Sequence, residues 1–360
     1  MTWLLLLILF LILLINCGLL LSVLSIRTHP DSIVPHLKIS VVIAAKNEER
    51  NIPGLISSLK NIDYSMDLFE VIIVDDNSTD NTFTSLAGSI SQNENIKYFR
   101  LPKENAAGKK NALTFGISKS SHDCILITDA DCNPSPGWIK SFAKKFYDGN
   151  ELVFGVAPYR QSKGILNKII CFENLRAHIL TFGAAKTGFA YSGAARSLGF
   201  RKEFFIKIGG YAATNELKSG DDDLLIREVI RNKLKIGVVA DESAFVFTES
   251  KSVISEYFSQ KSRHTSTSNY YLFRHKLFLS VWHFSNILII FSPLLLWFSY
   301  YSFFILAAKL LMDFLIVLIL QKKFSYAFKI HEILLLQITY ELLLIVHYIN
   351  SIHGKKRVWK

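Results

Sequence analysis

From residue 38 to residue 146, short apolar runs alternate with longer stretches in which apolar residues recur every three or four positions. The runs are rich in β-branched residues and predict buried strands at 39–45, 69–75, 96–101 and 124–128. The longer stretches predict helices over 51–60, 80–90, 109–119 and 134–146. Continuous apolar strands separated by crossover helices are typical of a parallel sheet covered on both faces. We therefore expect an α/β domain of Rossmann type, in which ligands bind at the carboxyl ends of the strands.

Beyond residue 150 this regular alternation is lost. Short strands are expected at 153–157 and 236–240, and we assign residues 150–250 to the second half of the same domain. No Gly-x-Gly-x-x-Gly motif follows the first strand, so the sequence does not favour binding of NAD or FAD.

The chain begins with an apolar segment, Trp3–Ile26, which is long enough to cross a bilayer. A cleavable signal peptide is the competing interpretation, but such a peptide has a basic region before its apolar core. No Lys or Arg precedes Arg27, and the first basic residues follow the segment. We therefore expect an uncleaved anchor, with the chain after it on the cytosolic side of the membrane.

Three further apolar segments lie near the carboxyl end. The segments 278–299 and 301–320 are each long enough to span a membrane. A third, 331–348, carries several polar residues and has basic flanks, so it either crosses the membrane or lies along its inner surface. Lys309 and Asp313 are four residues apart in the second segment, share a helix face and are expected to pair.

Composition agrees with a soluble domain that is attached to membrane segments. Half of the 360 residues are hydrophobic, and the mean hydropathy is +0.27. Nucleic acid is one possible reason for the net charge of +11, but with membrane segments present we expect an anionic membrane surface as the partner, and a nucleotide diphosphate would also benefit from the charge. The four cysteines have no metal-binding spacing, which is typical of a reduced cytosolic domain.

Candidate chemistry begins at Asp129 and Asp131, which directly follow the fourth strand. Two carboxylates at a strand end can hold a divalent cation, and a cation there can hold a diphosphate. The alternative is an ordinary acidic loop. Asp75 and Asp76 end the second strand and would face the same crevice, where one of them can accept hydrogen bonds from a base or a ribose. The alternative is a turn with a helix cap, and both can hold, since residues 78–80 can cap while Asp75 or Asp76 contacts a ligand.

Three other polar clusters have both a functional and an ordinary interpretation. Gly108, Lys109 and Lys110 open a helix, where they either bind phosphate or form a solvated basic turn. The acids at 221–223 precede an apolar helix, so they either cap it or supply a general base. The segment 260–264 either touches lipid headgroups or brings Arg263 to a diphosphate.

These clusters occur together and in one order, and residues 38–270 resemble the membrane-bound glycosyltransferases of family 2, which have the GT-A fold. Asp129 and Asp131 match the Asp-x-Asp metal motif of that family. Asp221 and Asp222 correspond to its catalytic acidic pair, although Asp223 leaves the register open. The segment 191–202 is similar to the family's acceptor-side loop. A Gln-x-x-Arg-Trp motif is matched by Gln260, Arg263 and His264, with His in the place of Trp.

The resemblance implies an anchor over 1–27, a GT-A domain over 38–270 and a membrane region of two or three helices over 278–350. It also implies inverting transfer of a sugar from a nucleotide sugar, with UDP as the expected nucleotide, to a lipid or a lipid-linked glycan. Asp222 or Asp221 would be the base, and Asp129 and Asp131 would hold Mg²⁺ or Mn²⁺. The implied nucleotide-sugar contacts are Ala45, Lys46, Glu48, Asp75, Asp76, Lys109, Asp129, Gln260, Arg263 and His264.

The implied location is the inner (plasma) membrane of a bacterium, with the catalytic domain in the cytosol and no nucleic-acid partner. Two other functions stay open. One is a processive polysaccharide synthase, which the replacement of Trp by His264 disfavours. The other is a membrane scaffold or transporter with a degenerate nucleotide-binding domain, which the clustered acids disfavour.

Overall fold

The computed structural model describes residues 2–27, 35–90, 95–104, 107–212, 220, 222–297 and 299–353. The chain divides into two compact units, each made of separate stretches of sequence. Among the described residues, the sheet unit lies within Thr28–Arg160 and Ser192–Glu249. The helical unit comprises Met1–Arg27, Gln161–Tyr191 and Ser250–Lys355.

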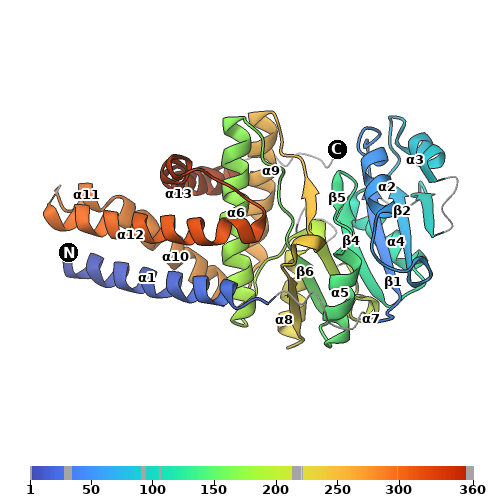
Figure 1. The fold of residues 1–360 in the computed structure, drawn as a ribbon, viewed down its shortest axis with the longest axis horizontal. Coiled ribbons are helices and arrows are strands. Elements are labelled where there is room, and N and C mark those ends of the chain that lie inside the picture. The colour runs from blue at the N-terminus through green and yellow to red at the C-terminus, as the bar shows by residue number, and fades with distance from the viewer. Residues whose placement is uncertain are drawn as a thin grey trace. The chain divides into compact units, whose positions relative to one another are not determined.

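The sheet unit is built on one sheet of seven strands in the order β3-β2-β1-β4-β7-β6-β8 (Figure 1). Their bounds are β1 Ile39–Ala45, β2 Phe69–Asp75, β3 Ile96–Arg100, β4 Cys124–Asp129, β6 Leu152–Gly155, β7 Leu198–Arg201 and β8 Ile236–Val239. The first four strands are parallel, whereas β7 is antiparallel to both of its neighbours. A small second sheet pairs β5 (Cys132–Pro134) with β9 (Val246–Thr248).

The interior of this unit follows from the apolar strands. All seven residues of β1 and all seven of β2 are buried, so helices must cover both faces of the sheet. The helices of the unit are α2 Ile52–Lys60, α3 Thr82–Ile90, α4 Lys109–Lys119, α5 Trp138–Tyr147, α7 Lys202–Lys207 and α8 Asp223–Arg231. Helix α5 places Trp138, Phe142 and Phe146 in the core without exposure.

The expected fold class is confirmed: a mostly parallel sheet with helices, followed and preceded by apolar helices. The strands expected at 39–45 and 69–75 have the bounds that the sequence predicts. Strands β5, β7 and β9 were not predicted. Each has three or four residues, which is too short for a periodic pattern to stand out.

The helical unit contains three helices that are long and apolar enough to cross a membrane, at Thr2–Leu24, Tyr300–Phe324 and Ile330–Ser351. Its other long helices are α6 Ile165–Lys186, α9 Ile254–Ser266 and α10 Phe273–Ile290. The segment expected to span at 278–299 is divided: α10 begins earlier and ends at residue 290, before the short α11 (Ser292–Leu295). Pro293 near the start of α11 explains the break, since proline suits a first helical turn but interrupts a helix interior.

Charged side chains are buried inside the helical unit. Lys309 on α12 (Tyr300–Leu320) pairs with Asp313 one turn later, as the sequence predicts. Arg176 of α6 also reaches Asp313, with 3.4 Å between Nη2 and Oδ1. Glu341 on α13 (Ile330–His353) lies 3.5 Å from the Lys309 ammonium. This ion cluster of two cations and two anions joins three helices without leaving a net charge.

Candidate active site

The carboxyl ends of three neighbouring strands meet at one edge of the sheet. In the register of the sheet, Ala45 lies opposite Asp75, and Ala44 lies opposite Asp129. The sequence therefore brings the acids of β2 and β4 to the two sides of β1, as expected for a crevice at the strand ends.

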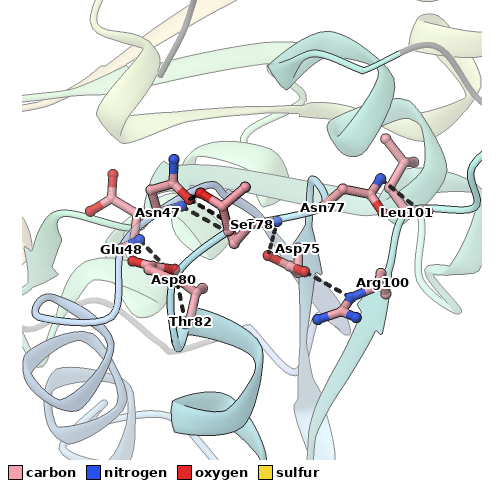
Figure 2. A network of polar contacts seen from close by, with 10 residues as sticks. Asn47, Glu48, Asp75, Asn77, Ser78, Asp80, Thr82, Arg100 and Leu101 are labelled. Carbon is pink, nitrogen blue, oxygen red and sulfur yellow. Dashed lines mark hydrogen bonds and ion pairs between the residues drawn. The ribbon is translucent and has the colours of Figure 1, made fainter.

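Hydrogen bonds join the loop after β1 to the loop after β2 (Figure 2). The Asn47 amide donates to Ser78 Oγ at 2.9 Å, and the Glu48 amide donates to Thr82 Oγ1 at 2.7 Å. Asn47 Oδ1 in turn accepts from the Thr79 amide. Asn47 has a φ of 55°, a left-handed conformation that asparagine adopts more readily than most residues. The two loops are thus held as one rigid rim, with Glu48 on it.

Asp75 is a structural member of this rim. Its side chain is fully buried, and Oδ1 accepts a hydrogen bond from the Ser78 amide at 3.2 Å. Oδ2 accepts from Arg100 Nε at 3.1 Å, and the Arg100 guanidinium lies 4.2 Å from the centre of the Phe83 ring. Both carboxylate oxygens therefore already have protein partners.

Asp76 has a different environment. Its Oδ2 accepts from Lys46 Nζ at 3.1 Å and from the Gly108 amide at 3.1 Å. Its Oδ1 is buried and has no hydrogen-bond partner among the described residues. A buried acceptor without a partner is costly, and an N–H group of a ligand would satisfy it. Gly108 reaches Asp76 with a φ of 141°, which side-chain-bearing residues rarely adopt.

The acids after β4 form a group that suits a divalent cation. Ligand atoms of Asp129, Asp131 and Cys132 lie within 4.8 Å of one another. Carboxylate oxygens are the ligands that Mg²⁺ and Mn²⁺ prefer. Burial raises the pKa of the Cys132 thiol well above its usual value, and the adjacent Asp131 adds to this shift. The thiol lies 3.4 Å from Asp131 Oδ1, and the two carboxylates are the fitting ligands because these cations prefer oxygen.

Lys109 lies at the first turn of α4 and forms an ion pair with Asp129, with 2.8 Å between Nζ and Oδ1. Lys109 and Lys46 thus both join the strand-end acids, one at Asp129 and the other at Asp76. The crevice holds fixed positive charge next to its carboxylates, an arrangement that can bind a metal-bound diphosphate.

The acids expected to supply a general base have unequal access. Asp222 precedes α8, is partly exposed, and accepts a hydrogen bond from the Ala195 amide at 2.9 Å. Asp223 is only 6% exposed. Asp221 lies outside the described residues. Among the acids that are described, Asp222 is therefore the better placed to meet a substrate hydroxyl.

Gln260, Arg263 and His264 lie on α9, which belongs to the helical unit. Gln260 lies one helical turn before the adjacent Arg263 and His264, so the three share a side of the helix. Their contact with a nucleotide sugar stays a prediction.

Sequence reasoning missed Arg196, which lies in the short 3-10 turn η2 (Ala195–Ser197). Its guanidinium carbon lies 4.3 Å from the centre of the Tyr159 ring. The charges of Asp131 and Asp129 act on it strongly enough to help raise its pKa. No spacing rule singles out one arginine in a loop, although the segment 191–202 that contains it did attract notice.

Comparison with known proteins gives one matching family model, described as glycosyl transferase family 2, over residues 40–204. A beta-monoglucosyldiacylglycerol synthase from Synechocystis sp. is 33% identical over 145 residues, which are 40% of this chain and 29% of that protein. A poly-beta-1,6-N-acetyl-D-glucosamine synthase from Staphylococcus aureus is 28% identical over 193 residues, which are 51% of this chain and 45% of that protein. The chain thus spans less than half the length of these relatives.

A solved structure resembles almost the whole chain. It is the mannosyltransferase PcManGT from Pyrobaculum calidifontis, in complex with GDP-Man and Mn²⁺. The TM-score is 0.57 with 15% identity, and the match covers 97% of this chain and 99% of that chain. At this level of identity, the likeness concerns the fold.

Proposed function

Because the chain belongs to glycosyltransferase family 2, we propose that it transfers a sugar from a nucleoside diphosphate sugar to an acceptor at the membrane. The observation that carries this proposal is the meeting of Asp76 and Asp129 at the carboxyl edge of the sheet. There, an unpartnered buried carboxylate oxygen lies near a pair of acids suited to a cation. A base that donates an N–H and a diphosphate that needs a cation match these two features.

The donor would bind along this edge. Asp76 Oδ1 would accept a hydrogen bond from the base, while Lys46 holds Oδ2 of the same carboxylate. Asp129 and Asp131 would hold Mg²⁺ or Mn²⁺, which when bound acts as a Lewis acid toward the diphosphate. Lys109 lies close enough to Asp129 to add its charge to the same group. UDP is the nucleotide that we expect from the family resemblance.

Asp222 would take the proton from the acceptor hydroxyl as that oxygen attacks the anomeric carbon. The Ala195 amide holds Asp222 by its Oδ2 and so orients the carboxylate for this task. A single displacement with one base inverts the anomeric configuration, so no second nucleophilic carboxylate is required.

We propose a lipid or a lipid-linked glycan as the acceptor, in the inner membrane of a bacterium, with the catalytic groups on the cytosolic side. Support comes from the three helices that are long and apolar enough to cross a membrane. It also comes from a relative that is named for a glucosylated diacylglycerol. An assay with detergent-solubilised lipid extract against soluble sugars separates a lipid acceptor from a soluble one.

The first test is donor turnover by the purified full chain. UDP-, GDP- and dTDP-sugars are compared, with and without Mn²⁺, for the wild type, Asp131→Ala and Asp76→Asn. We expect metal-dependent release of one nucleotide by the wild type and none by Asp131→Ala. For Asp76→Asn, we expect the dissociation constant of the donor to rise about tenfold or more. Asp63→Asn, whose exposed carboxylate pairs with Lys140 at 3.1 Å, is the matched control. Absence of binding by every donor would refute the proposal.

A processive polysaccharide synthase is the second candidate, favoured by the relative from Staphylococcus aureus that is named for a polymer. In the family resemblance, His264 stands where processive synthases have Trp. Product length on a gel decides between them: a ladder of long chains indicates processive synthesis, and one added sugar indicates single transfer.

A further inference from the structure

Arg196 has the surroundings of an anion-binding residue. Its guanidinium lies over the Tyr159 ring at 4.3 Å and donates one hydrogen bond, from Nη2 to the Ala157 carbonyl, at 2.9 Å. That is the one hydrogen bond the side chain makes within the described part of the chain, and a guanidinium has five N–H donors. The stack on Tyr159 thus fixes the group and leaves donors for a ligand.

Tyr159 and Thr248 connect this arginine to the candidate metal site. Tyr159 forms a β-bridge with Thr248, and Thr248 Oγ1 donates to the Asp131 carbonyl at 3.1 Å. A guanidinium stays charged throughout the physiological pH range, and Asp131 and Asp129 are among the groups close enough to act on its charge. The guanidinium is therefore a permanent cation beside the acidic pair.

The same turn also reaches the candidate base. The amide of Ala195, the residue before Arg196, donates to Asp222 Oδ2 at 2.9 Å. On the other side, Ser197 Oγ accepts from the indole of Trp138 at 3.2 Å, in the core. Turn η2 is therefore anchored in the interior, and the residue before Arg196 contacts the candidate base.

The charges next to the candidate metal site favour a diphosphate as the ligand. Asp129 and Asp131 carry two negative charges, which a bound divalent cation would neutralise. Lys109 and Arg196 then add two positive charges next to the candidate metal site, and the diphosphate of a nucleotide sugar carries two negative ones. We propose that Arg196 binds the diphosphate of the donor and stabilises it as the leaving group. This inference rests on the proposed function.

The test separates diphosphate binding from a structural role. Titration calorimetry on the full chain in detergent micelles would measure Mn²⁺ alone, and then UDP and GDP with Mn²⁺ present. For Arg196→Gln, we expect nucleoside diphosphate affinity to fall about tenfold or more. Affinity for Mn²⁺ alone should stay the same or rise, because a cation next to the acids has been removed. Arg196→Lys keeps the charge but lacks the planar guanidinium, so its nucleoside diphosphate affinity should lie between those of the wild type and Arg196→Gln.

Arg160→Gln is the matched control. Arg160 also stacks on a ring, that of Phe247 at 4.8 Å, but its ion pair with Glu249 at 3.5 Å is largely exposed. We expect its nucleotide and metal affinities to match those of the wild type. Thermal unfolding beside this control shows whether Arg196→Gln folds. If it does not fold, the partial loss of nucleoside diphosphate affinity expected in Arg196→Lys tests the inference instead.

Three outcomes would overturn the inference. The first is an affinity of Arg196→Gln for nucleoside diphosphates within twofold of that of the wild type. The second is a change in Arg196→Gln confined to a raised KM for a phosphorylated lipid acceptor, which would assign Arg196 to the acceptor phosphate. Equal weakening of metal and nucleotide binding would show that Arg196 only maintains the fold of the site. A wild-type chain that binds neither UDP nor GDP would instead refute the proposed function itself.

Discussion

Adjacent carboxylates at the end of β2 have opposite surroundings. Asp75 gives both oxygens to Ser78 and Arg100, whereas Asp76 keeps one buried oxygen without a partner among the described residues. In a strand, successive side chains point to opposite faces, so neighbours in sequence meet different environments. At the scale of single residues, the distinction between support and ligand binding therefore depends on hydrogen-bond partners and not on residue type.

Glu70 at the start of β2 is a second buried acid, and its role is structural. It accepts hydrogen bonds from Ser40 Oγ at 2.8 Å and from Lys97 Nζ at 2.9 Å. Burial alone would raise the pKa of Glu70, but the Ser121 amide and Lys97 outweigh burial and hold the pKa at about 2. The carboxylate thus ties three strands together at the edge opposite the candidate site.

This low pKa makes stability depend on pH in a defined direction. A depressed pKa stabilises the folded chain above the unfolded value of about 4.3, and the gain is lost as pH falls toward 2. We expect Glu70→Gln to lower the free energy of unfolding by about 1–2 kcal/mol at pH 7, a modest figure because half-exposed Lys97 is screened by solvent. Thermal unfolding of both chains from pH 7 to pH 3 checks this, since the difference between them should shrink with acid.

At the scale of elements, the packing of α4 on the sheet depends on one glycine. A Cβ on Gly116 would lie 2.5 Å from Val42 Cγ1 and 3.2 Å from Val74 Cγ2, which belong to β1 and β2. The helix therefore packs on the sheet more closely than any larger residue permits. This close approach matters for the candidate site, because Gly108 and Lys109 lie at the amino end of the same helix.

Gly116→Ala should consequently destabilise the chain by about 1–3 kcal/mol through overpacking, despite the better helix propensity of alanine. Gly88→Ala in α3 is the matched change, because nothing lies within 4 Å of the added Cβ. There we expect a gain of about 0.5–1 kcal/mol. Denaturant unfolding of the full chain in detergent measures both. Equal effects of the two substitutions would show that α4 can shift away from the sheet without cost.

The sequence predicted the elements that have many residues of one pattern. Strands β1, β2 and β4 are mostly apolar runs, and the acids at the ends of β2 and β4 could be placed at one edge from strand polarity alone. β7 could not be predicted, since its four residues include Gly199 and its partners come from strands far away in sequence. Arg196 was missed for a related reason: its neighbours Tyr159 and Ala157 come from another part of the chain.

At the scale of the whole molecule, the ion cluster of Arg176, Lys309, Asp313 and Glu341 ties together α6, α12 and α13, and α6 and α12 also pack on α1 (Thr2–Leu24). Large apolar side chains on the outside of α1, such as Trp3 and Phe10, are more than half exposed, in keeping with a surrounding bilayer. Inside, the four charges are buried and must be satisfied by one another.

Removing one charged residue of the ion cluster should therefore lower the free energy of unfolding more than removing two residues of opposite charge. Asp313→Ala leaves Lys309 and Arg176 without their shared partner, and we expect a loss of about 3 kcal/mol or more. The double change Lys309→Met with Asp313→Leu removes opposite charges together and should restore much of it. Thermal unfolding and the monodisperse fraction in detergent report the difference. A double variant less stable than Asp313→Ala would contradict this explanation.

The interleaving of the two units along the chain limits how the gene can be divided. The chain passes from one unit to the other after residues 27, 160, 191 and 249, so neither unit is encoded by one continuous stretch. A shortened chain that ends at residue 249 would keep α1 and α6 but lose α12 and α13, which pack on them. The freed apolar faces would then favour aggregation. Insertions, tags and fusions are therefore best placed at the chain ends, and the two units are constrained to evolve as one gene.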